Sequence, residues 1–101
     1  MKATGTVSMY VGILDGKGKV WGVRIPDAPG CYGGGPTPEA AIDDAASALA
    51  ELVAEGHEIG LPRSIEAILA NRKVKIDVKR GDILVLIKAP ARKRRKERAV
   101  A

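Results

Sequence analysis

A proline- and glycine-rich segment between residues 26 and 36 constrains the fold of this chain more than any other feature. It contains three prolines and the glycine triplet Gly33–Gly35. Proline fixes φ and removes a hydrogen-bond donor, so a central strand cannot continue through Pro26 and Pro29. Residues 31–32 leave room only for a very short strand, after which the glycines allow the chain to turn. The segment therefore separates an extended N-terminal part from the elements that follow.

The N-terminal part has the pattern of a β-hairpin. Between Thr4 and Leu14, apolar residues at positions 7, 9, 11 and 13 alternate with Thr, Ser, Tyr and Gly, which is the period-two pattern of a half-buried strand. Residues 15–18, Asp-Gly-Lys-Gly, predict a turn, because glycine tolerates positive φ and Asp can bond its own backbone. Residues 19–25 predict the returning antiparallel strand.

The residues after the glycines predict a long helix. Thr37 is a good N-cap, Pro38 suits the first helical position, and Glu39 lies near the positive end of the helix dipole. Apolar residues recur at steps of three and four and Gly56 is a suitable stop, which predicts a helix of roughly 17–18 residues. The apolar stripe comprises Ile42, Ala45, Ala46, Leu49, Leu52 and Val53.

The C-terminal half adds shorter elements. Ser64 is a suitable cap for a short helix through about Ala70. Apolar residues alternate at positions 74, 76 and 78, and a turn is expected at residues 80–82. The unbroken apolar run Ile83–Ile87 predicts a strand that is covered on both faces.

Length and composition limit the class of protein. The chain of 101 residues fits one domain, which we place at residues 1–90, followed by a basic and disordered tail at residues 91–101. No apolar run is long enough for a transmembrane helix. Met1 and Lys2 are not followed by an apolar signal segment, and the single Cys31 cannot form an intramolecular disulfide. We therefore expect a cytoplasmic protein with no membrane partner.

The net charge of +5 conceals a segregation of charge along the chain. Residues 25–62 contain seven acidic residues and no Lys or Arg, whereas residues 88–101 contain seven basic residues and one acidic residue. Each segment is either a solvated surface or a binding site for a molecule of opposite charge. The candidate acidic face of the helix comprises Glu39, Asp43, Asp44, Glu51 and Glu55. The candidate basic cluster of the tail comprises Arg92, Lys93, Arg94, Arg95, Lys96 and Arg98.

Several segments share a pattern with a known family. Gly22–Cys31 combines an aliphatic strand with a Pro-Asp-x-Pro-Gly-Cys turn, and the glycines and Thr37–Ala40 follow it. Leu61–Ser64 and Ile83–Ile87 fit a connector and a closing strand. In this combination, over roughly residues 7–88, the chain resembles the HicB-like antitoxin family.

The resemblance implies an α+β fold of the degraded ribonuclease-H-like type, in which a small antiparallel sheet carries one main helix on a face. The implied order is β-β-β-α-β, with the short second helix in addition. The resemblance also implies a function, because such antitoxins bind and silence HicA, a small basic toxin that cleaves messenger RNA. Many of them carry a DNA-binding module after the sheet domain, and we expect none here because only about a dozen residues follow Ile87.

A catalytic site is not expected. A ribonuclease H needs several carboxylates that converge on two divalent metals, and no acidic residue lies inside a predicted strand. His57 follows a helix end and suits an interaction with the helix dipole better than catalysis, and Cys31 suits a small buried hydrophobe better than a nucleophile. No Gly-Lys-Ser/Thr follows Gly33–Gly35, so a hinge to the helix is favoured over a phosphate cradle. We predict no enzyme activity, no metal and no cofactor.

Two functional hypotheses remain. In the first, a non-catalytic antitoxin uses the acidic helix face to bind and neutralise a HicA-like toxin, because a toxin that cleaves RNA must present basic groups to phosphate. In the second, an orphan nucleic-acid-associated protein binds DNA or RNA through the basic tail. A residual hydrolase is a third hypothesis, which the lack of strand carboxylates disfavours. The edges of so small a sheet also predict a homodimer or a higher homo-oligomer.

Overall fold

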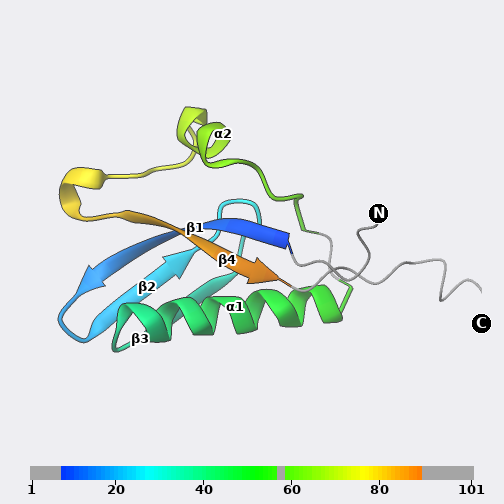
Figure 1. Ribbon diagram of the computed structural model, residues 1–101, viewed down its shortest axis with the longest axis horizontal. Coiled ribbons are helices and arrows are strands. Elements are labelled where there is room, and N and C mark those ends of the chain that lie inside the picture. The colour runs from blue at the N-terminus through cyan, green and yellow to red at the C-terminus, as the bar shows by residue number, and fades with distance from the viewer. Residues whose placement is uncertain (1–7, 57–58, 90–101) are drawn as a thin grey trace, which may run out of the picture.

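Four antiparallel strands form one sheet in the order β3-β2-β1-β4. The computed structural model describes residues 8–56 and 59–89. The predicted α+β class, the order β-β-β-α-β and the short second helix are confirmed. The elements are β1 (Ser8–Lys17), β2 (Val20–Arg24), β3 (Tyr32–Gly35), α1 (Pro38–Ala54), α2 (Ile65–Ala70), the 3-10 turn η1 (Val78–Arg80) and β4 (Ile83–Ala89) (Figure 1).

The predicted hairpin is present, but its turn is shorter than expected. β1 extends through Lys17, which pairs with Val20, so only Gly18 and Lys19 connect the two strands. Gly18 has a φ of +61°, and the Trp21 indole N–H donates to its carbonyl at 2.9 Å. The turn predicted at residues 15–18 was therefore placed too early, because strand pairing continues until a two-residue loop remains.

Both faces of β1 are buried, in contrast to the half-buried strand predicted. Tyr10 and Leu14 belong to the core beneath α1, and the alternation along a strand places Val11 and Ile13 on the other face. Val11 and Ile13 are nevertheless only 2% and 0% exposed. A second layer therefore covers the face of the sheet that lies away from α1.

The second layer is formed by α2 and the segment that follows it. Arg24 pairs with Ile13 across the strands and so shares its face, and the Arg24 guanidinium donates to the carbonyl of Lys75. Ile68 of α2 is fully buried. Helices α1 and α2 accordingly lie on opposite sides of the sheet (Figure 1).

The glycine triplet is a strand rather than a hinge. It belongs to β3, which pairs with β2, and α1 lies directly against it. A Cβ on Gly33 would lie 2.3 Å from the backbone nitrogen of Ala45, and a Cβ on Gly35 would lie 2.7 Å from the Cβ of Ala40. The predicted hinge was wrong because these glycines are required for the close approach of the helix to the sheet.

The ends of α1 agree with the prediction. The Thr37 hydroxyl accepts from the Ala40 N–H at 3.0 Å, and Pro38 is the first helical residue. Gly56 has a φ of +79°, and its N–H donates to the Val53 carbonyl at 3.1 Å, so it ends the helix as expected. Ala45 and Leu49 of the predicted stripe are fully buried, as is Ala41, which the periodicity did not select.

The region before the last strand departs from its sequence pattern. The alternation at positions 74, 76 and 78 produces no strand, and the chain instead runs through an irregular segment into η1. β4 is an edge strand, with Ile83 and Leu86 each 50% exposed, so the expectation of a strand covered on both faces was wrong. The residues of β4 are apolar on both faces because one face packs beneath α1 and the other lies at the margin of the second layer.

Substitution of Gly33 tests the contact between α1 and β3. We expect Gly33→Ala to lower the free energy of unfolding by about 2–3 kcal/mol, because the added methyl group overlaps the helix backbone. Gly34→Ala is the matched control, since its Cβ would lie no closer than 3.4 Å to another atom, and we expect a change within about 0.5 kcal/mol. Urea denaturation followed by the fluorescence of Trp21 measures both, and equal losses would contradict this account.

Candidate functional site

Four acidic side chains form a ridge along α1. Glu39, Asp43, Glu51 and Glu55 follow one another at multiples of four residues, with Ser47 completing the series, and all are exposed. Residues four apart are neighbours on a helix surface, but each step of four turns about 40° around the axis, so the series winds about 160° across the exposed side of α1 over about 24 Å. We call these four residues the acidic ridge.

Asp44, the fifth acidic residue of the predicted face, has a different environment. Its carboxylate accepts from the backbone N–H of Gly34 at 2.9 Å. Gly34 lies on β3, which is an edge of the sheet, so the carboxylate occupies a donor that another strand would otherwise use. The structure therefore leaves four of the five predicted residues exposed in a row that winds around α1, and gives the fifth a bond to the sheet edge.

The stability of the helix does not explain the ridge. Like charges four residues apart destabilise a helix, by about 0.2–0.5 kcal/mol for each pair. The last turn of α1 contains no basic residue, and Glu51 and Glu55 lie toward the negative end of the helix dipole. Glu51 and Glu55 are thus unfavourable for α1 in isolation, whereas Glu39 lies in the first turn, where a carboxylate is favourable.

Asp27 is the acidic residue whose role the sequence did not reveal. It is 8% exposed, and its carboxylate accepts from Arg63 twice, from Nε at 2.6 Å and from the backbone N–H at 2.8 Å. The Asp27 carbonyl also accepts from Gly60, whose own carbonyl accepts from the Tyr10 hydroxyl at 2.7 Å. These bonds hold the connector before α2 against the turn after β2, and only the proximity of Asp27 to Pro26 and Pro29 marked it in the sequence.

Cys31 is buried, as predicted. It is 2% exposed, and its Sγ lies 4.0 Å from the Ala45 carbonyl. Burial removes the thiolate from water and raises the pKa of the Cys31 thiol. The side chain therefore packs as a small apolar group beneath α1.

Other predicted residues cannot be placed. His57 and the tail cluster at residues 92–98 lie outside the described residues. Within residues 8–56 and 59–89, no three His, Cys, Asp or Glu side chains come close enough to hold a metal ion. No helix in this part of the chain is long and apolar enough to cross a membrane.

The two edges of the sheet differ in how a second copy could pair with them. At β3 the Asp44 carboxylate occupies the Gly34 N–H, whereas β4 exposes Ile83 and Leu86. An edge with unpaired backbone groups and apolar side chains is the better template for another strand. The predicted homodimer stays a prediction, and β4 is the edge that suits it.

Comparisons with known proteins agree on the fold. The family model for the "HicB_like antitoxin of bacterial toxin-antitoxin system" matches residues 10–99. No curated protein shows significant similarity to the chain. A chain of the solved HicA3 and HicB3 toxin–antitoxin complex is 20% identical with a TM-score of 0.59, over 80% of this chain and 96% of that one.

Two further structures come from Burkholderia pseudomallei. The N-terminal domain of its antitoxin HicB is 23% identical with a TM-score of 0.56, over 78% of this chain and 94% of that one. The antitoxin HicB itself is 21% identical with a TM-score of 0.55, over 84% of this chain and 62% of that one. At such identities the structures show a shared fold, and the resemblance seen in the sequence is confirmed by the family model.

Removal of the Asp27 carboxylate tests the bond to the connector. We expect Asp27→Ala to lower the free energy of unfolding by about 2–3 kcal/mol, because the Arg63 N–H and guanidinium lose a charged acceptor. The exposed control Glu66→Ala is expected to change it by less than about 0.5 kcal/mol. Thermal or urea unfolding measures both, and an Asp27→Ala protein as stable as the control would refute the role assigned to the carboxylate.

The reactivity of Cys31 tests its burial. We expect the folded protein to react with iodoacetamide more than about tenfold more slowly than the urea-unfolded protein, because access is blocked and the thiolate is disfavoured. The raised pKa also means that the folded state binds the thiol proton more tightly, so its stability falls as the pH rises above the ordinary thiol pKa. Equal reaction rates for the folded and unfolded chain would contradict this placement.

Proposed function

Because the chain belongs to the HicB-like antitoxin family, we propose that it neutralises a HicA-like toxin by presenting the acidic ridge of α1 to the toxin's basic surface. The observation that carries the proposal is the ridge itself, an exposed row of four carboxylates whose last two lie at the end of the helix that disfavours negative charge. No Lys or Arg occurs between residues 25 and 62.

A solved relative supports the choice of partner. The solved HicA3 and HicB3 toxin–antitoxin complex contains a chain with this fold. A toxin that acts on RNA must bind phosphate and must therefore expose basic side chains. A helix that presents four carboxylates is complementary to such a surface.

Electrostatic complementarity acts on the toxin in two ways. It raises the rate of encounter, because opposite potentials steer the two proteins together. It also places carboxylates where RNA phosphates would bind, so RNA and antitoxin compete for the same basic groups. In this proposal the chain is non-catalytic, and it inactivates the toxin by covering it.

The second hypothesis, binding of nucleic acid by the tail cluster, concerns residues outside the described part of the chain. It predicts an affinity for nucleic acid that is insensitive to α1. The acidic ridge favours the antitoxin hypothesis, because four carboxylates on α1 contribute nothing to the binding of phosphate by the tail.

Charge reversal on the ridge tests the proposal. We expect Asp43→Lys with Glu51→Lys to weaken binding to a HicA-like toxin at least about tenfold, mostly through a slower association rate. Both side chains are exposed, so the fold tolerates the change. Surface plasmon resonance with the purified toxin measures the rates, and a toxin-dependent RNA-cleavage assay measures neutralisation.

The matched control carries the same change in net charge away from the ridge. Asp15→Lys with Glu66→Lys alters β1 and α2, and we expect it to leave the dissociation rate unchanged and the association rate within about threefold. Equal weakening by both double variants would show a non-specific charge effect. Full neutralisation by the ridge variant would overturn the proposal.

A further inference from the structure

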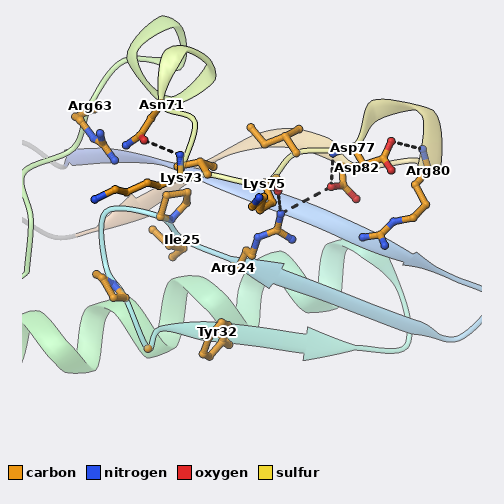
Figure 2. A pocket seen from close by; sticks show the side chains of 15 residues that line it. Arg24, Ile25, Tyr32, Arg63, Asn71, Lys73, Lys75, Asp77, Arg80 and Asp82 are labelled. Atoms are coloured by element: carbon orange, nitrogen blue, oxygen red, sulfur yellow. Dashed lines mark hydrogen bonds and ion pairs between the residues drawn. The ribbon is translucent and has the colours of Figure 1, made fainter.

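A cleft of about 860 Å³ lies on the side of the sheet opposite α1 (Figure 2). One side of the cleft is formed by the end of β2, the start of β3 and the turn between them. The other side is the irregular segment between α2 and β4 (Figure 2). Arg24 reaches from the sheet to this segment, where it bonds the Lys75 carbonyl and pairs with Asp82 at 3.8 Å (Figure 2). The cleft is therefore built from segments that are far apart in the sequence.

Basic side chains predominate around the cleft. Five basic residues and two acidic residues line it. Arg24 and Arg63 are already paired with carboxylates. Lys73, Lys75 and Arg80 are exposed and have no carboxylate partner among the described residues. Three cations are thus available to an anionic ligand.

The two acidic residues of the cleft, Asp77 and Asp82, accept hydrogen bonds from the backbone of the cleft itself. The Asp82 side chain is 2% exposed, and its Oδ2 accepts from the backbone N–H of Asp77 at 2.8 Å. The carboxylate of Asp77 accepts from the backbone N–H of Arg80 at 3.2 Å. Both carboxylates shape the turn at η1 and keep their charge, so the five basic and two acidic residues of the cleft leave it with a net formal charge of +3.

Tyr32 adds an aromatic ring to the same cleft. It pairs with Arg24 across β2 and β3, so the two side chains share the face of the sheet away from α1. Tyr32 is 65% exposed, so its ring is open to a ligand. An exposed ring beside a group of cations is the combination that binds unpaired nucleotides, because the bases stack and the phosphates pair with the cations.

We propose that this cleft binds single-stranded nucleic acid, with phosphates held by Lys73, Lys75 and Arg80 and one base stacked on Tyr32. A duplex offers phosphates but no unpaired base to the ring. A basic toxin is repelled by the cleft, and it is attracted to the ridge on the other side of the sheet. The two surfaces do not overlap, so the inference stands apart from the antitoxin proposal, and both ligands can bind at once.

Fluorescence anisotropy of the full chain tests this site. The probe is a labelled 12-nucleotide RNA without secondary structure, with DNA of the same sequence and a duplex of equal length as further arms. We expect Lys73→Gln with Lys75→Gln and Arg80→Gln to weaken RNA binding at least about tenfold and to reduce the slope of log affinity against log salt by about 2. We expect Tyr32→Ala to weaken it about tenfold and Tyr32→Phe to leave it unchanged.

The matched control removes three charges from the tail. Arg94→Gln with Arg95→Gln and Lys96→Gln lowers the net charge equally, and a smaller loss than that of the cleft variant supports the proposal. Tighter binding of single strands than of the duplex also supports it, and the RNA and DNA arms show which sugar is preferred.

Three outcomes would overturn the inference. The first is that the labelled strands do not bind at all. The second is that only the tail variant loses affinity while Tyr32→Ala binds like the unmodified chain. The third is that a 12-residue glutamate peptide displaces the RNA as readily as unlabelled RNA does, while Tyr32→Ala binds RNA like the unmodified chain. That result would show that the cleft binds an acidic protein segment.

Discussion

The contact between α1 and β3 is the constraint on which the remaining structure depends. The helix backbone lies so close to the strand that only glycine fits at positions 33 and 35, and the facing helix residues Ala41 and Ala45 are fully buried. Close contact fixes the rotation of the helix about its axis. Because the alanines face the sheet, the acidic ridge faces outward and Asp44 reaches the edge of β3. The packing of α1 against β3 thus determines which residues form the core, how the β3 edge is capped and which charged side chains are exposed.

The second layer of the sheet has a different physical basis. It contains little regular structure, and polar bonds help to hold it in place. Asp27 anchors its beginning through Arg63 and Gly60, and Arg24 anchors its end through Asp82 and the Lys75 carbonyl. Charge-assisted hydrogen bonds to backbone groups are strong and directional, so they can position a segment that has no ladder of its own.

Charge is consequently sorted between the two sides of the sheet. On one side of the sheet, α1 presents a row of exposed carboxylates. On the opposite side, basic side chains surround the exposed Tyr32. A small protein of this kind has room for one core only, but its single sheet offers two faces with opposite potentials. That arrangement is consistent with the proposed toxin-binding surface on α1 and the proposed nucleic-acid cleft on the opposite side of the sheet.

The amino-acid sequence alone determined the features that depend on near neighbours. The cap at Thr37, the stop at Gly56 and the existence of the β1–β2 hairpin follow from short-range sequence patterns, because their physical causes act over a few residues. Tertiary structure decided the rest. The strand identity of the glycines, the burial of both faces of β1 and the Asp27–Arg63 pair arise between residues far apart in the chain. Periodicity reports which side of an element is apolar, but it contains no information about which distant segment will cover that side.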